Sequence, residues 1–308
     1  MQVPRSGCDL EPRLDVLHGL VCYARRSKPY SSSGLKSLKL MPSNATPSMV
    51  SNAPANAENS AAAPLAHEAI HDTVAGILEK EPRGPLLDVP AGEGALAARL
   101  STAGFQVSCC DLYPEIFRLN NVSIRQGDLN GELPFDDRSF DYVACLEGLE
   151  HIENPQQAIR EFARLLRPGG KVIVSVPNIL NIEERLKWLL YGYTSHFKPM
   201  TRAQVERLRA EYDNREEIAA HVNPIGYSEL RYILEKYGFQ IEGVHRDKPK
   251  ANAWLYWPIV LLIRLIARLT PAAKRSERWT EELASDEVLM GGNTLIVEAR
   301  LSEIRSGI

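Results

Sequence analysis

A carboxylate and two closely spaced glycines follow an apolar run in the first half of the chain. Residues Leu86–Gly94 read LLDVPAGEG, and an alanine-rich helical pattern follows them. Because glycine has no Cβ, its backbone can adopt positive φ and approach a ligand closely. The first N–H groups of the following helix lack intrahelical acceptors and can point at that ligand. The spacing therefore predicts a strand, a tight turn and a helix that together bind the phosphate or nucleoside part of a cofactor.

Two cofactors are compatible with this turn. Gly92–Ala97 matches the dinucleotide fingerprint G-x-G-x-x-G/A, and Asp111 follows at about the 20-residue spacing of a ribose-binding acid. Read from Asp88 onward, the same residues resemble the first motif of class I S-adenosylmethionine-dependent methyltransferases. Pro90 stands where that family has its first glycine. Proline fixes φ near about −65° and has no N–H, so it removes the donor for one backbone contact to the cofactor.

Acidic residues also lie at the ends of three further predicted strands. Asp111 ends the second strand, Asp128 follows the third, and Glu147 follows the fourth. A carboxylate at the end of the second strand can accept hydrogen bonds from both hydroxyls of a ribose. For Asp111 and Asp128 the alternative is a structural role in a turn or loop.

The residues after the fourth strand carry a more specific resemblance. Cys145–Ile152 reads CLEGLEHI, and Arg167–Gly170 reads RPGG just before the fifth strand. This combination resembles the ubiquinone-biosynthesis O-methyltransferases over about Leu86–Val176. A looser resemblance, at Asn223–Phe239, is to bacterial methyltransferases associated with glycans or lipids. The resemblance implies S-adenosylmethionine as the cofactor. It assigns cofactor binding to Asp88, Pro90, Gly92, Gly94, Asp111, Leu112, Asp128, Leu129, Leu146 and Glu147.

The order of the predicted elements indicates an α/β fold. Strands and helices alternate, which is typical of an open, mostly parallel sheet with helices on both faces. Strands are expected at residues 85–90, 105–111, 122–126, 140–146, 171–176, 239–244 and 294–299. The resemblance implies the Rossmann-like sheet of class I methyltransferases, in which the seventh strand is antiparallel.

The N-terminal extension is expected to lack regular structure. Residues 65–301 are expected to form the methyltransferase domain and 302–308 a tail. Residues 1–64 are mildly basic and then rich in Ser, Ala, Asn and Pro, a composition typical of a disordered extension. Two alternatives for this extension are a targeting peptide and a true start at Met41 or Met49.

Two insertions interrupt the pattern, at about residues 178–227 and 245–292. They follow the fifth and sixth strands, at the edge where open α/β sheets bind ligands, so we expect them to form a substrate lid. Residues 254–269 of the second insertion are apolar but too short to span a bilayer, and Arg264 and Arg268 lie one turn apart. This stretch is either a helix in the membrane interface or a lid helix that packs on the protein.

His151 is the first candidate for a general base. It lies just past the fourth strand, and histidine titrates near neutral pH, so it could take the proton of an acceptor hydroxyl. His196 and His221 in the first insertion are weaker candidates. The alternative for all three is a structural hydrogen bond. Glu147 could lie near the methionine part of the cofactor, Glu150 is interpreted as structural, and no spacing indicates a metal site.

Composition limits the remaining choices. The chain has 308 residues, a hydrophobic share of 44% and a formal net charge of −3, so it lacks the basic excess of a nucleic-acid-binding protein. Its five cysteines form no C-x-x-C pair, and a reducing cytoplasm is expected. The favoured function is O-methylation of a small, lipid-linked or glycan-linked acceptor. The alternatives are a cofactor-binding interaction module and an NAD-dependent oxidoreductase.

Overall fold

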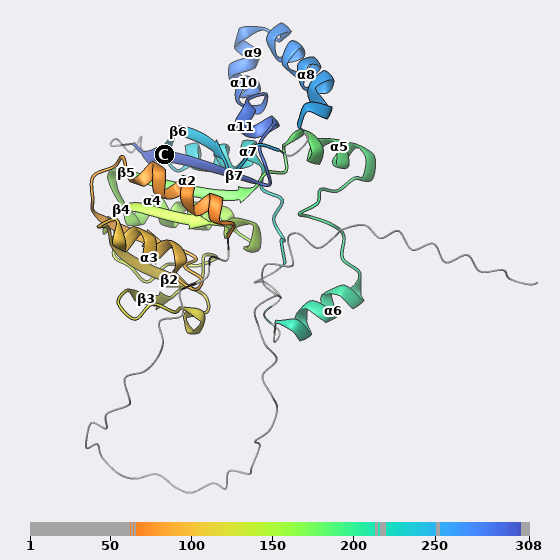
Figure 1. Ribbon diagram of the computed structural model, residues 1–308. Coiled ribbons are helices and arrows are strands. Elements are labelled where there is room, and N and C mark those ends of the chain that lie inside the picture. The colour runs from red at the N-terminus through yellow and green to blue at the C-terminus, as the bar shows by residue number, and fades with distance from the viewer. Residues whose placement is uncertain are drawn as a thin grey trace, which may run out of the picture. The chain divides into compact units, whose positions relative to one another are not determined.

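The computed structural model describes residues 62, 64, 66–212, 215, 220–250 and 253–302, apart from the side chain of residue 253. All of the predicted N-terminal extension except residues 62 and 64 lies outside the described residues, as do residues 303–308 of the predicted tail. The described residues form a sheet and the helices that surround it (Figure 1).

The described part of the chain contains a seven-stranded sheet with the strand order β3-β2-β1-β4-β5-β7-β6. β7 runs antiparallel to both β5 and β6, and the other neighbouring pairs are parallel. This arrangement confirms the predicted sheet and its antiparallel seventh strand. The strands are β1 (Pro85–Asp88), β2 (Gln106–Asp111), β3 (Ser123–Gln126), β4 (Phe140–Leu146), β5 (Leu166–Pro177), β6 (Phe239–Arg246) and β7 (Thr294–Leu301).

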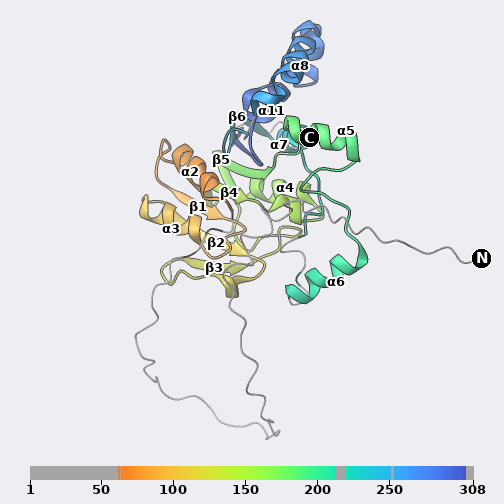
Figure 2. The ribbon, with the colours of Figure 1, turned by 45° about the vertical axis from the view of Figure 1, so that its right-hand side comes forward.

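Helices cover both faces of the sheet because the strands are apolar on both faces. In β4, Tyr142 and Ala144 pack with α2 (Glu68–Leu78) and α3 (Ala95–Thr102). Val143 faces the opposite way and packs with α4 (Pro155–Leu165) and α7 (Tyr227–Lys236). Successive side chains of a strand point to opposite faces, which places the two helix pairs on opposite sides. Figure 2 shows α2 and α3 to one side of the strands and α4 to the other.

Local signals fix several of these elements. The Asn154 side chain accepts a hydrogen bond from the Gln157 N–H and so caps α4, whose first residue is a proline. β5 differs from its prediction, since it begins at Leu166 rather than Lys171. The Arg-Pro-Gly-Gly sequence indicates a turn, but Leu166 pairs with Phe140 across a register shift, so the strand starts before the glycines.

The two insertions contain short helices. The first holds α5 (Ile182–Tyr191) and α6 (Arg202–Glu211), and Thr201 and Gln204 form a capping box at the start of α6. The second holds η4 (Ala253–Tyr256), α8 (Trp257–Leu269), α9 (Ala272–Glu277), α10 (Thr280–Leu283) and α11 (Asp286–Leu289). Ile182, Val260 and Leu289 form a small apolar cluster that joins α5, α8 and α11. α5 of the first insertion therefore packs against the second insertion beyond the carboxyl ends of β5 and β6 (Figures 1 and 2).

Candidate cofactor and acceptor site

The glycine turn after β1 adopts the backbone conformation that its sequence predicts. Gly92 and Gly94 have φ of 54° and 95°. A Cβ on Gly94 would lie 2.7 Å from Cε2 of Phe117, so the site excludes a side chain by both backbone conformation and space. Gly94 is also the N-cap of α3, so the helix begins directly at the turn. The peptide bond between Val89 and Pro90 is cis.

The Asp111 carboxylate holds this turn against the end of β2. Its Oδ2 accepts a hydrogen bond of 2.8 Å from the Gly92 N–H, and its Oδ1 accepts one of 2.9 Å from the Tyr113 N–H. Asp111 is buried. A carboxylate has about four acceptor positions, so both oxygens retain capacity for a ligand's hydroxyl groups after these two bonds.

Asp88 ends β1 on the other side of the turn and is almost fully buried, at 2% exposure. Its Oδ2 has no hydrogen-bond partner among the described residues. Burial, followed by the nearby Asp111 carboxylate, raises the pKa of Asp88 to about 8. A buried acceptor without a partner is costly, so this oxygen marks a position where a ligand's donor group would be stabilised.

The remaining predicted cofactor residues lie at the ends of β2, β3 and β4. Asp128 Oδ1 accepts hydrogen bonds from both the backbone and the side chain of Asn130, which is the loop role considered as its alternative. Leu129 and Leu146 are buried, and Leu112 is half-buried with its carbonyl bonded to a glutamine at the end of β3. The sheet therefore presents apolar and acidic side chains at one edge.

Glu147 follows β4 in a backbone conformation that is uncommon for a residue with a side chain, with φ of 49°. Its N–H donates to Ser175 Oγ, and the Ser175 hydroxyl donates to Glu147 Oε1 at 2.9 Å. Burial raises the pKa of Glu147 to about 7, although the bond from Ser175 opposes the shift. The carboxyl group is thus fixed by the neighbouring strand β5.

A group of ionisable side chains that the sequence left separate comes together after β4. The turn η2 (Leu149–His151) is joined to a segment about 70 residues later, because the Glu150 carbonyl accepts hydrogen bonds from the Val222 and Asn223 N–H groups. His151 Nδ1 lies 3.1 Å from the carbonyl oxygen of Ala220. These contacts place His221 against His151, with ring centroids 4.7 Å apart.

The electrostatics of this group follow from burial. The carboxylate of Glu150 is fully buried, which raises the pKa of Glu150 well above its usual value, and the nearby Glu147 adds to the shift. Burial, followed by the neighbouring His151 and His196, lowers the pKa of His221 to about 3. The ring of His196 stacks on that of His221 at a centroid distance of 6.1 Å. His221 therefore lies between His151, the predicted base, and His196.

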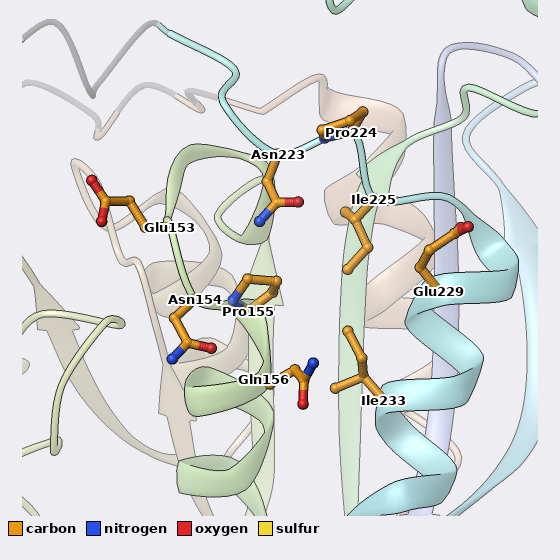
Figure 3. Close-up of a pocket in the computed structure, with 9 residues that line it drawn as sticks. All are labelled: Glu153, Asn154, Pro155, Gln156, Asn223, Pro224, Ile225, Glu229 and Ile233. Atoms are coloured by element: carbon orange, nitrogen blue, oxygen red, sulfur yellow. The ribbon is translucent and has the colours of Figure 1, made fainter.

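A pocket of about 310 Å³ lies beside this histidine group. Figure 3 shows it between the N-terminal end of α4 and the segment that leads into α7. None of the residues predicted to bind the cofactor lines it, although the Asn223 side chain donates to the carbonyl of Ile152 in the loop that carries His151. The lining residues are Glu153, Asn154, Pro155, Gln156, Asn223, Pro224, Ile225, Glu229 and Ile233.

Residues 87–174 match the protein family described as "Methyltransferase domain". The match covers β1 to β5, including the glycine turn, Asp111 and the residues after β4. Together with the strand order and the antiparallel β7, it identifies this part of the chain as a class I S-adenosylmethionine-dependent methyltransferase domain.

The similar curated proteins share only part of their length with the chain. The chain is 38% identical over 105 residues to a ubiquinone biosynthesis O-methyltransferase of Xanthomonas euvesicatoria pv. vesicatoria, over 30% of this chain and 43% of that protein. It is also 38% identical over 111 residues to the same enzyme of Xanthomonas axonopodis pv. citri, over 32% of this chain and 45% of that protein. The similarity thus spans less than half of these relatives.

Two solved structures that superpose on part of the chain are described as S-adenosylmethionine-dependent methyltransferases. A S-adenosylmethionine-dependent methyltransferase from Archaeoglobus fulgidus is 14% identical, with a TM-score of 0.45 over 75% of this chain and 94% of that one. One from Mesorhizobium loti is 17% identical, with a TM-score of 0.43 over 74% of this chain and 96% of that one.

Proposed function

We propose that the protein transfers a methyl group from S-adenosylmethionine to an oxygen atom of a small, lipid-linked or glycan-linked acceptor. The observation that carries this proposal is the Asp111 carboxylate, which bonds the backbone of the glycine turn and retains acceptor capacity toward the same edge. Hydroxyl groups of a ribose would use that capacity. The partnerless Oδ2 of Asp88 suits a donor such as the ammonium group of the cofactor.

The reaction chiefly requires positioning. S-adenosylmethionine supplies a methyl group on a positively charged sulfur, which is already activated for transfer, so the protein has to align the acceptor with it. His151 is suited to take the acceptor's proton. A carbonyl oxygen can only accept, so in a neutral ring the contact with Ala220 requires the proton on Nδ1 and leaves the lone pair on Nε2. The neutral ring then acts as the general base.

The two insertions form the acceptor-binding lid in this proposal. They start where β5 and β6 end, and they are joined by the apolar cluster at Ile182 and Val260 and by a hydrogen bond from the Arg185 side chain to the Leu283 carbonyl. The acceptor would therefore meet one packed unit rather than two independent loops. The free, buried thiols Cys109, Cys110 and Cys145 are in keeping with the expected cytoplasmic location.

A labelled-methyl experiment tests the reaction. The full chain is incubated with S-adenosylmethionine labelled in the methyl group and with phenols, polyprenyl-linked glycans and amines as separate acceptors. Label should enter a hydroxyl acceptor, and His151→Gln should lower the rate while leaving S-adenosylhomocysteine binding unchanged. Label entering amines alone would replace O-methylation by N-methylation. Binding without any transfer would favour the interaction-module alternative.

A peripheral membrane contact through residues 254–269 completes the proposal. The structure contains no helix, within the ranges it describes, that is both long and apolar enough to cross a bilayer. α8 packs inward through Val260 and Ala267, while leucines on its other faces are exposed, among them Leu262 at 56% and Leu265 at 52%. Arg268 borders this face and is also exposed. Exposed leucines with a cation at their rim suit the interface of an anionic bilayer.

Vesicle flotation tests this contact. The full chain should float with vesicles that contain an anionic lipid, and Leu262→Glu and Leu265→Glu should each abolish flotation. Tyr232→Glu is the matched control, because Tyr232 is equally exposed, at 56%, but belongs to α7. Equal flotation of all three variants would instead assign α8 to packing within the protein or against another chain.

A further inference from the structure

The side chains of Glu150, His151 and His221 each offer one ligand atom, and these atoms all lie within 4.8 Å of one another. We propose that this group binds one divalent transition-metal ion. The sequence predicted no metal site, because His221 lies in the first insertion, far along the chain from the Glu150-His151 pair. The geometry is created by the hydrogen bonds that join residues 220–223 to the turn η2.

The unpaired Glu150 carboxylate is the strongest evidence for a cation. Glu150 is 0% exposed, and neither of its carboxylate oxygens has a hydrogen-bond partner in another described residue. Burying a carboxylate without a counter-charge or donors is expensive. Protonation would remove the charge, yet it would leave an O–H donor in the same surroundings without an acceptor. A bound cation satisfies both oxygens at once.

The histidines present the atoms that such a cation needs. His221 Nδ1 is buried and has no hydrogen-bond partner among the described residues. His151 Nδ1 lies 3.1 Å from the Ala220 carbonyl oxygen, so a metal-bound ring would donate from Nδ1 to this carbonyl and bind the ion through Nε2. A backbone carbonyl on the second ring nitrogen is the usual way in which a metal-binding histidine is oriented. The carboxyl group and the two imidazoles thus converge on one point.

The chemistry of the three ligands selects the class of metal. Two imidazole nitrogens and one carboxylate suit Zn²⁺, Mn²⁺ or Fe²⁺, and Zn²⁺ sites of this composition keep an open position for another ligand. Mg²⁺ and Ca²⁺ prefer oxygen ligands throughout. Ligand atoms up to 4.8 Å apart would have to approach one another by a small contraction when the ion binds, because Zn–N bonds are about 2.0–2.1 Å.

The place of the group in the fold indicates its use. It follows Glu147 at the carboxyl end of β4, on the edge where the methyl donor is expected. A cation there would hold the acceptor's oxygen and lower the pKa of its hydroxyl group, and the proton would pass to solvent water. With the metal bound, His151 would be a ligand and would not act as the general base. This use depends on the proposed methyl transfer, whereas the binding of the metal does not.

Calorimetric titration of the full, EDTA-treated chain with Zn²⁺, and separately with Mn²⁺, tests the proposal. One equivalent should bind. Removal of a residue that only orients a ligand typically weakens metal binding tenfold to about hundredfold. Glu150→Gln and His221→Gln remove the ligands themselves, so each should weaken binding by more than this. His67→Gln is the control, because His67 caps α2 on the opposite face of the sheet. Circular dichroism confirms that each variant is folded.

Unchanged affinity in both Glu150→Gln and His221→Gln would overturn the proposal, as would the absence of binding by the folded wild type. Ions held elsewhere, for example by the cysteines near the N-terminus, would not respond to Glu150→Gln. S-adenosylhomocysteine binding is measured on the same samples. Metal binding without binding of this ligand would refute the methyltransferase proposal and leave the metal site in place.

Discussion

Replacing Asp111 by asparagine removes a charge from the clamp that holds the glycine turn. In the wild type each carboxylate oxygen accepts one backbone N–H, from Gly92 at 2.8 Å and from Tyr113 at 2.9 Å. Asparagine keeps a single oxygen and presents an NH₂ group in place of the other. One of the two backbone donors then faces another donor in a buried site.

The size of the effect follows from this geometry. A hydrogen bond to a charged group contributes about 1.5–3 kcal/mol, and a buried donor left without a partner costs about 1–3 kcal/mol. We expect Asp111→Asn to lower the free energy of unfolding by about 2–3 kcal/mol. In a domain of roughly 240 residues this corresponds to a fall in Tm of about 4–12 °C. S-adenosylhomocysteine binding should weaken at least tenfold, since each tenfold corresponds to about 1.4 kcal/mol.

Thermal unfolding and calorimetric titration of the same preparations measure both quantities. Asp128→Asn is the matched control, because Asp128 receives both of its hydrogen bonds on one oxygen, which asparagine retains. Its unfolding midpoint should change by less than about 2 °C. Equal midpoints for Asp111→Asn and Asp128→Asn would refute the clamp, whatever the two variants do to cofactor affinity.

Three further variants probe other parts of the structure. Gly94→Ala should lower the free energy of unfolding by about 1–3 kcal/mol, because its Cβ would meet Phe117 at 2.7 Å in a turn with φ of 95°; urea unfolding measures this loss. Lys171→Met should cost about 3–5 kcal/mol at pH 7, since the buried ammonium lies within 2.9 Å of three glutamates. Burial alone would raise the pKa of these glutamates, but hydrogen bonds from Arg300 and Lys171 to Glu242, and from Lys171 and His245 to Glu298, outweigh burial and lower both pKa values. The loss in the free energy of unfolding should therefore narrow as the pH falls below about 4.5, and a constant loss would contradict this account. Asp88→Asn should gain stability relative to the wild type as the pH rises from about 4 to about 8, because the pKa of the carboxyl group is about 8 in the folded chain and 3.8 for an ordinary aspartate. Parallel pH profiles of stability for the two proteins would exclude a raised pKa.

Elements defined by short-range signals were predictable from the sequence. β4 has the expected bounds, Phe140–Leu146, because its residues are apolar on both faces and a polar loop follows. α4 begins after Asn154 because an N-cap and a first-turn proline act within one turn of helix, and such signals can be read from the local sequence. The position of Asp111 beside the turn was also predictable, because the carboxyl ends of adjacent parallel strands meet at one edge, but its hydrogen bond from the Gly92 N–H was not predicted.

Features that depend on distant residues were not predictable. Nothing in the local sequence of His221 distinguishes it from a solvated loop histidine, and only the two backbone bonds to the Glu150 carbonyl bring it to His151. Similarly, Lys171 appears as an ordinary strand residue, although it is buried between glutamates from β6, β7 and the loop before β1. In both cases the chemistry arises from pairing between elements far apart in the chain.

The most direct test of the central claim is calorimetric titration of the purified full chain with S-adenosylhomocysteine, with NADH as the control. A cofactor site built on Asp88, the glycine turn and Asp111 predicts saturable micromolar binding of S-adenosylhomocysteine and no heat with NADH. Binding of NADH instead would assign the turn to a dinucleotide. No binding of either ligand by the folded protein would contradict the methyltransferase assignment of its activity.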